Sequence, residues 1–540
     1  MSPAIITFIF SHIIINKITI QVPIRLCCLP RTVEKMLKIF NLTVSNRAVV
    51  ILGIFGLGCI FGGLYVGFRA MPEIITSKIW EMKVLKENTD QWDMFMKTPF
   101  PFTFKVYMFD VQNPDEILQG AKPIVRETGP FVYKVYKWKS DIKWDTPDDI
   151  SYYSYMRYEF DEEASGVYTD DLKVTIFNTA YYGMIQKIED IQPEALPMVE
   201  GVLPSVFGEN HGLFIKVKVK DYLFDGLKLC ENGGKQGGFL AGMVCKQTVD
   251  RLAENKNMRM ENNTILFANM HYKNNTHLGR FTVKSGIKKR EETATLTLYD
   301  GQDYISVWTG EKSICNRIHG TTTVFPVNID KNMTFEAYSE DICRTIGLEY
   351  SEDETFKDLL GYKFVAKNDT FSSKKEDNSC YCTNKTRSLD GEFACLKDGL
   401  TDLTTCRGAS VLVSFPHLLY GDKEYLNGVF GLKPDKSKHE TSLILEPVSG
   451  IPLRIYQRVQ FNIFLRPIEN MISLENVSTS LFPLFWVEES LVLDDQYVDS
   501  LKKDLFRTMH IIDILKWVVI GIGVACTLTA MVLRMYSNTP

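Results

Sequence analysis

The chain has 540 residues, of which 45% are hydrophobic and 12% aromatic, and its formal net charge is −5 at pH 7. A weakly acidic chain lacks the basic patch that nucleic-acid binding requires, so no nucleic-acid partner is expected. The apolar fraction is sufficient for a large packed core and excludes disorder of the whole chain.

Two apolar segments lie near the ends of the chain. Ala48 to Phe68 holds no charge between Arg47 and Arg69, and Trp517 to Leu533 holds none between Lys516 and Arg534. At about 1.5 Å per helical residue, such segments match a hydrocarbon core of roughly 30 Å, so both are predicted to cross a membrane. The predicted order is a cytoplasmic tail 1–47, a span 48–68, an extracellular domain 69–516, a second span 517–533 and a cytoplasmic tail 534–540.

Charge and glycosylation sequons set the orientation. Basic residues from Arg25 to Arg47 precede the first span, and short basic segments stay on the cytoplasmic side. A sequon at Asn41 falls on that side and should stay unmodified. The protein is therefore expected in the plasma membrane with the central region outside, where six Asn-x-Ser/Thr sequons are expected to be glycosylated: Asn262, Asn274, Asn332, Asn368, Asn384 and Asn476.

Eight of the twelve cysteines lie in the predicted extracellular region, where an oxidising compartment favours disulfides. Zinc binding is the alternative role for these cysteines, but their spacing fits no ordinary zinc finger or ribbon. No metal or other cofactor is therefore expected. The other four cysteines are expected within the spans or on their cytoplasmic side, either as palmitoylation sites or as inert apolar residues. They are Cys27, Cys28, Cys59 and Cys526. The eight outer cysteines are Cys230, Cys245, Cys315, Cys343, Cys380, Cys382, Cys395 and Cys406.

The central region reads as a single α+β unit. Apolar and mixed residues alternate from Phe102 to Phe109, a strand pattern that ends at Asn113-Pro114, and another strand is expected after Gly129-Pro130. Leu172 to Val206 is expected to be helical in short pieces, because prolines interrupt it. Lysines 216, 218 and 220 form a comb on one strand, which we interpret as a solvated outer face rather than an anion site.

Small residues recur at helical spacing within the first span. This pattern predicts close helix contact, either between the two spans or between subunits of a homo-oligomer, and Gly521-x-x-x-Ala525 offers a partner in the second span. The predicted contact residues are Gly58, Gly62, Gly63 and Gly67.

Several motifs of the central region resemble those of the class B scavenger receptors. Within that family, Leu481 to Glu489, Val283 to Lys288 and the extra pair Cys230 and Cys245 are similar to the insect sensory neuron membrane proteins. The resemblance covers roughly residues 45 to 535. The motifs that carry it are Asn113 to Glu116, Glu127 to Pro130, Asp341 to Arg344, Tyr381 between two cysteines, Ser414 to Tyr420, Glu446 to Gly450 and Arg458 to Asn462.

The resemblance implies a fold and a cysteine map. The implied fold is a large antiparallel β-barrel with a membrane-distal helical bundle, formed by Leu172 to Val206, and an apolar tunnel toward the bilayer. Tyr182 and Phe214 are expected near its entrance, as ligand contacts. Gly208 to His211 replaces lysines of several family members, which favours neutral ligands. The implied disulfides are Cys230–Cys245, Cys315–Cys380, Cys343–Cys406 and Cys382–Cys395.

Three classes of function compete. The first is a receptor that captures hydrophobic, pheromone-like or lipid ligands and passes them to the membrane or an odorant receptor, with a general scavenger or lipid-uptake receptor as its near alternative. An ion-channel subunit is the second, although Thr527 and Thr529 are the only hydroxyls of the second span and lie on different helix faces. The third, an ecto-enzyme, is disfavoured because no Gly-x-Ser-x-Gly or His-Glu-x-x-His motif is present.

Overall fold

The structure is a computed structural model that describes residues 45–408 and 410–537. It divides into two compact units, Met1–Ile79 with Leu493–Pro540 and the central Trp80–Val492. The predictions for Asn41, Cys27, Cys28 and most of the tail 1–47 therefore lie outside the described residues.

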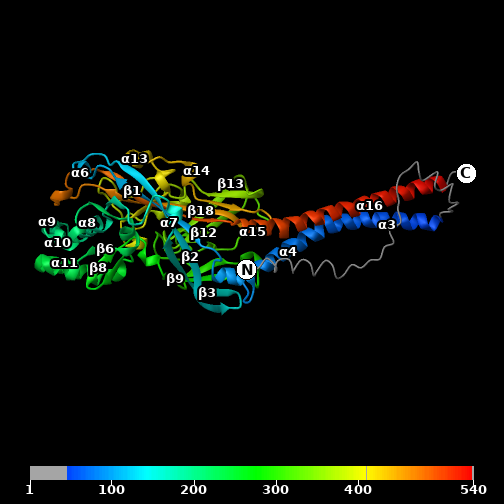
Figure 1. The fold of residues 1–540 in the computed structure, drawn as a ribbon, viewed down its shortest axis with the longest axis horizontal. Helices are drawn as coiled ribbons and strands as arrows, with labels where there is room; N and C mark the ends of the chain where they lie inside the picture. Colours follow the sequence, from blue (N-terminus) through cyan, green and yellow to red (C-terminus); the bar gives the residue numbers. More distant parts are fainter. Residues whose placement is uncertain (1–44, 409, 538–540) are drawn as a thin grey trace. The chain divides into compact units, whose positions relative to one another are not determined.

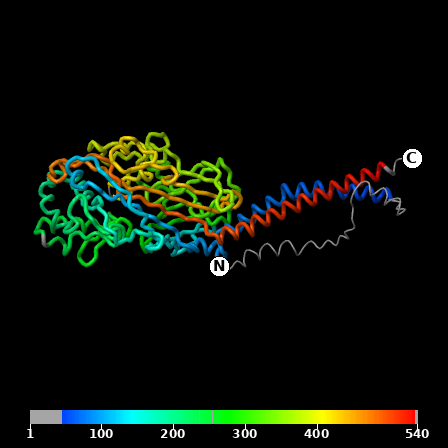
Figure 2. Tube along the Cα trace, turned by 45° about the horizontal axis from the view of Figure 1, so that its top comes forward, coloured from blue at the N-terminus to red at the C-terminus, as the bar shows by residue number. Residues whose placement is uncertain are grey.

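The described part of the first unit lies mainly within two long helical runs, which lie side by side in Figures 1 and 2. Both runs are long and apolar enough to cross a membrane, Asn46–Lys83 and Asp495–Met535, and they contain the two predicted spans. The first comprises α3 (Asn46–Tyr65), a π-helical turn (Val66–Ala70) and α4 (Met71–Lys83). The second comprises α15 (Asp495–Ser500), another π-helical turn (Leu501–Phe506) and α16 (Arg507–Ser537).

A 14-stranded sheet forms the body of the second unit, in the order β11-β10-β9-β3-β2-β1-β19-β18-β17-β14-β13-β12, with β15 and β16 attached beside β18. Its strand pairs are antiparallel. The edge strands β11 and β12 lie against each other, and the sheet is therefore nearly closed. Their approach is so close that a Cβ added to Gly320 of β11 would collide with the carbonyl oxygen of Glu336 in β12. The strands are β1 (Phe102–Val111), β2 (Val125–Thr146), β3 (Asp149–Phe160), β9 (Thr276–Lys284), β10 (Thr295–Tyr299), β11 (Gly320–Thr321), β12 (Thr334–Ser339), β13 (Arg344–Phe356), β14 (Leu359–Ala366), β15 (Thr401–Asp402), β16 (Leu412–Ser414), β17 (Ser442–Leu445), β18 (Pro452–Leu465) and β19 (Ser480–Val492).

The alternating segment at residues 102–109 is strand β1, as predicted, and it lies between β2 and β19. Val106 is opposite Phe131 on one side and Val487 on the other, so its apolar face continues across three strands. The prediction that a strand starts after Pro130 was wrong. β2 already begins at Val125 and continues through Gly129-Pro130, where its register with β1 shifts.

Short helices gather where the proline-rich segment was expected to be helical. They are α8 (Thr179–Ile191), α9 (Leu196–Glu200) and α10 (Leu203–Phe207). The beginning of the segment differs from the prediction, because Lys173–Phe177 is strand β4, which pairs with β5 (Phe214–Lys218). Alternating Val174 and Ile176 are buried in that strand, and this period-2 signal is too short to detect beside the helical residues that follow.

The lysine comb lies on β5 and directly after it. Lys218 and Lys220 form ion pairs with Asp171 at 2.7 and 3.0 Å, while Lys216 is exposed. These lysines are thus partly neutralised at the surface, which agrees with the interpretation as an outer strand face.

The remaining elements of this region form a second small sheet and a helix. Strands β6 (Leu227–Leu229), β8 (Thr264–Phe267) and β7 (Met258–Glu261) pair in that order, and α11 (Gly238–Asp250) packs against α10. The disulfide between Cys230 and Cys245 ties α11 to the turn after β6.

Candidate functional site

The largest apolar cluster joins the short helices to the sheet. It contains Tyr182 and Leu203 from α8 and α10, together with Phe104 of β1, Phe131 of β2 and Phe485 of β19. Burying large side chains of this kind stabilises each by roughly 2 kcal/mol or more. The helices and one face of the nearly closed sheet therefore share one apolar interior.

A second apolar cluster adjoins the first. It contains Phe335, Phe364 and Leu443 from β12, β14 and β17. Val459 and Phe461 of β18 pack against both clusters. The apolar packing consequently continues from the helices through the sheet to its far strands.

Charged side chains interrupt this apolar interior beside Phe102 and Phe104, a part of the interior that we call its polar level. The register places Glu489 opposite Phe104, and Glu489 forms an ion pair with Lys137 of β2. The ammonium of Lys137 also lies 4.5 Å from the centre of the Phe102 ring. Lys139, two residues further along β2 and on the same face, donates to the backbone carbonyl of Phe95 at 2.6 Å. Burial and the neighbouring Lys137 lower the pKa of Lys139 to about 7.

A buried ion cluster lies near the Lys137–Glu489 pair. Asp341 forms ion pairs with Lys273 and with Arg407, the second at 2.9 Å. Burial opposes ionisation of Asp341, but Lys273 and Arg407 hold its pKa below the usual range. Burial and the Asp341 charge raise the pKa of Glu340, which favours its neutral form. The interior is therefore apolar over most of its length and polar at this level.

The two predicted ligand contacts differ in their surroundings. Tyr182 is fully buried, and its hydroxyl donates to the backbone carbonyl of Arg466 at 3.2 Å. Phe214 is half-buried, with its ring centre 5.8 Å from that of Phe177 and 5.7 Å from that of Phe482. Tyr182 is thus packed as a core residue, and Phe214 is the one that reaches the surface.

Two of the signature motifs, at Glu127 and His417, meet in a polar cluster that also contains His439. Nε2 of His417 donates to a carboxylate oxygen of Glu127 at 2.5 Å, and the indole N–H of Trp486 donates to the same oxygen at 2.8 Å. The two imidazole rings stack with centres 4.4 Å apart. Burial opposes the charge on Glu127, but hydrogen bonds from His417 and Trp486 hold its pKa below the usual value.

The ligand atoms of these three residues lie within 4.8 Å of one another, which is compact enough to consider a metal. However, Nδ1 of His417 accepts from the backbone N–H of Lys433, and Nδ1 of His439 accepts from that of Asp435, both at 3.0 Å. In a neutral imidazole this places the proton on Nε2, the atom that a metal would need. The residues therefore do not fit a metal site, and both rings instead fasten the backbone at residues 433–435.

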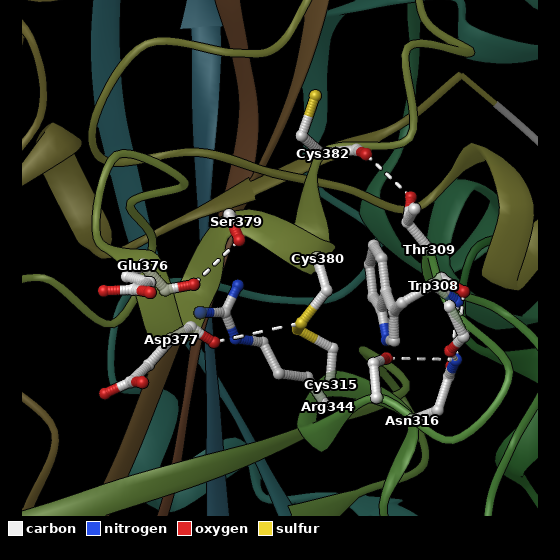
Figure 3. Close-up of a disulfide and its surroundings, with 12 residues drawn as sticks. Trp308, Thr309, Cys315, Asn316, Arg344, Glu376, Asp377, Ser379, Cys380 and Cys382 are labelled. Atoms are coloured by element: carbon white, nitrogen blue, oxygen red, sulfur yellow. Dashed lines mark hydrogen bonds between the residues drawn. A yellow bond between two sulfur atoms is a disulfide. The ribbon is translucent and has the colours of Figure 1, made fainter.

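The structure pairs the eight outer cysteines as the resemblance implied. Figure 3 shows the Cys315–Cys380 bond beside Trp308 and Asn316. The buried Asn316 amide donates to the carbonyl of Trp308 at 2.9 Å and fixes the turn that carries Cys315. The four disulfides are Cys230–Cys245, Cys315–Cys380, Cys343–Cys406 and Cys382–Cys395.

The predicted glycosylation sites are mostly accessible. Asn274 is half-buried and its side-chain oxygen accepts from the backbone N–H of Tyr158 at 3.1 Å. The other five are exposed: Asn262, Asn332, Asn368, Asn384 and Asn476.

The two long helices touch through glycines, and two of the four predicted contact residues take part. Gly63 faces Ile520 and Gly67 faces Lys516, whereas a Cβ on Gly58 or Gly62 would meet nothing within 4 Å. Gly56, which the prediction missed, approaches the backbone of the second helix, since its added Cβ would lie 2.8 Å from the carbonyl oxygen of Gly523. The missed signal is the seven-residue spacing of Gly56 and Gly63, which keeps both on one helix face.

Comparison with known proteins agrees with this architecture. The model of the CD36 family matches residues 54–534, so the chain belongs to the CD36 family, the class B scavenger receptors. It is similar to sensory neuron membrane protein 2 of Heliothis virescens, with 30% identity over 90% of this chain and 93% of the relative. It is also similar to sensory neuron membrane protein 1 of Apis mellifera (30% identity, 90% and 91% covered) and of Ostrinia furnacalis (32% identity, 87% of each). The family, the two candidate membrane helices and the four disulfides together describe a membrane receptor.

Proposed function

We propose that the protein captures hydrophobic, pheromone-like or lipid-derived molecules outside the cell and passes them through its interior to the membrane or to an odorant receptor. The observation that carries this proposal is the continuous apolar core. One cluster joins the helices α8 and α10 to β1, β2 and β19, and Val459 and Phe461 connect it to the second cluster. The names of the relatives support a sensory membrane as the setting.

The energetic need for such a passage follows from ligand size. A chain of about a dozen methylenes carries roughly 10 kcal/mol of transfer free energy, at about 0.8 kcal/mol each, and this opposes its movement through water. A protein interior that accepts the chain removes that barrier. Short and soluble molecules need no such help.

The polar level of the interior favours particular ligands. The Lys137–Glu489 pair satisfies both of its own charges, and Lys273 and Arg407 are both paired with Asp341. An anionic ligand would therefore have to break an existing ion pair, whereas a neutral ester, aldehyde or hydrocarbon would not. We propose neutral ligands on this ground and because Gly208 to His211 offers no lysine.

The proposed topology places both tails in the cytoplasm and the segment 69–516 outside the cell. The closely packed pair of helices would anchor this domain, with contact between subunits as a second use of the same spans. A lipid-uptake receptor of the same family is the alternative function, and it shares the apolar core. Within the described part of the second span, Thr527 and Thr529 bond to carbonyls of their own helix at 2.8 Å, which supports an anchor rather than a pore.

The decisive test is the response of receptor cells to a homologous series of odorants with and without this protein. Replacing Phe214 with glutamate should lower the response to long chains progressively and leave that to short chains unchanged. The matched control is Phe393→Glu, because Phe393 is exposed and Arg387 lies 4.4 Å from its ring, where a carboxylate would be accepted. Surface expression is measured for both. Equal responses at every chain length, with and without the protein, would overturn the proposal.

A further inference from the structure

One glycosylation sequon lies directly on a disulfide. The side-chain oxygen of Asn384 is 3.3 Å from Sγ of Cys382 and 3.4 Å from Sγ of Cys395, and these two sulfurs are bonded to each other. A disulfide sulfur carries no proton, so these are packing contacts of the amide against the bond. Any group attached to the Asn384 amide would start within a few ångströms of both sulfurs.

This disulfide is also the most accessible of the four. Cys395 is exposed and Cys382 half-buried, whereas Cys230, Cys245 and Cys315 are each 1% exposed. Figure 3 shows the sulfur of Cys382 directed away from the Cys315–Cys380 bond, while its backbone carbonyl accepts from the hydroxyl of Thr309 at 2.9 Å. Thiol–disulfide exchange requires a thiolate to reach a sulfur, so access governs its rate. The bare polypeptide leaves this bond open to attack.

The third residue of the sequon shows when a sugar could be added. Thr386 is 7% exposed, and its hydroxyl is engaged by the carboxylate of Asp402 and by the hydroxyl of Thr404 at 2.7 Å. The glycosylating enzyme needs the sequon hydroxyl, and the folded chain does not present it. Asn384 itself remains exposed, with a φ of 52° that asparagine tolerates. A glycan at Asn384 is therefore added before this segment folds, and the segment can then close with the sugar outside.

We propose that Asn384 carries an N-glycan whose first sugars cover the Cys382–Cys395 bond and slow its reduction by thiols. A glycan is bulky and well hydrated, and it needs no specific contact to obstruct the approach of a reductant. The effect is local, because no other sequon asparagine of the described residues lies within hydrogen-bonding range of a disulfide sulfur. This inference does not depend on which ligand the receptor carries.

The test uses the full-length protein from insect cells, purified in detergent. Native protein is exposed to a mild thiol reductant, alkylated at intervals, and the peptides that contain Cys382 and Cys395 are quantified by mass spectrometry. Asn384→Gln should raise the rate of alkylation at these two cysteines by about tenfold, since access controls the exchange. The rates at Cys230 and Cys245 should stay unchanged, which reports that the variant is folded.

Three controls separate the glycan from the side chain. Asn332→Gln removes an exposed sequon elsewhere and should change no rate. Thr386→Ser keeps the sequon and its hydroxyl, and should keep the slow rate. Enzymatic removal of the glycans from the wild-type protein should reproduce the fast rate of Asn384→Gln. An unglycosylated Asn384 in the wild-type protein, or equal rates with and without its glycan, would overturn the proposal.

Discussion

The cluster of Glu127, His417 and His439 predicts that the protein loses stability in acid, and by how much. His439 is 4% exposed, and burial together with the neighbouring His417 lowers its pKa from 6.5 to about 4. Glu127 and Asp435 favour the protonated ring, and Arg458 opposes it. Because the unfolded chain binds this proton more readily than the folded one, the stability conferred by the neutral ring is complete above about pH 6.5. It declines as the pH falls toward 4.

The magnitude follows from the same shift. A change of one pKa unit corresponds to about 1.4 kcal/mol, so a depression from 6.5 to about 4 removes on the order of 3 kcal/mol by pH 4. Protonation at Nδ1 also removes the acceptor for the backbone N–H of Asp435. The loss should therefore appear first as local opening of the segment that the two rings fasten.

The assay is amide hydrogen exchange of the purified protein between pH 7 and pH 4, corrected for the intrinsic pH dependence of exchange, with the thermal unfolding midpoint followed in parallel. Protection at Asp435 should decrease with the pH in the wild-type protein. His439→Gln should abolish this dependence, since the glutamine oxygen can accept the same hydrogen bond but does not titrate. His319→Gln is the matched control, because His319 is partly exposed and 4.0 Å from Glu336. An identical acid response in wild type and His439→Gln would refute the reasoning.

Three further predictions concern the covalent and helical framework. Removing Cys343, Cys406 or both should lower the stability equally, by about 4 kcal/mol for a loop of 63 residues, as measured by thermal unfolding, and peptide mapping that joins Cys343 to another cysteine would contradict the pairing. Gly56→Leu should separate the two long helices, seen as a longer distance between spin labels placed on them. Gly58→Leu should not, since Gly58, unlike Gly56, does not approach the second helix. Enzymatic deglycosylation should shift the mass by several glycans, and a glycan found at Asn41 would reverse the proposed orientation.

Local patterns predicted the elements that depend on local residues. The alternation of Phe102 to Phe109 gave β1, and the prolines of the 172–206 segment correctly divided α8, α9 and α10. The start of β2 was misplaced because Gly129-Pro130 reads as a boundary, whereas the strand passes through it with a register shift. A turn signal in the sequence cannot show whether a partner strand continues on both sides.

The candidate site was less predictable because its residues meet over long sequence separations. Lys137 and Glu489 are 352 residues apart, and His417 and Glu127 are 290 apart. No local period reports such a pairing, since it depends on the strand order of the whole sheet. Gly56 was missed for a different reason, because four-residue spacing was given more weight than the seven-residue spacing of Gly56 and Gly63 that a helix pair uses.

The motifs that carry the family resemblance turn out to hold the framework together. His417 and Trp486 both donate to Glu127, and Arg458 forms a buried ion pair with Glu488 at 2.8 Å. Each of these groups is satisfied by a protein partner, so none is left to select a ligand. Specificity would then lie with interior positions outside those motifs, such as Lys139, whose hydrogen bond is to a backbone carbonyl rather than to a carboxylate. Under the proposed function, two members of this family could share these polar contacts and still carry different molecules, because Glu127, His417 and Glu488 lie outside the apolar clusters that ligand would cross.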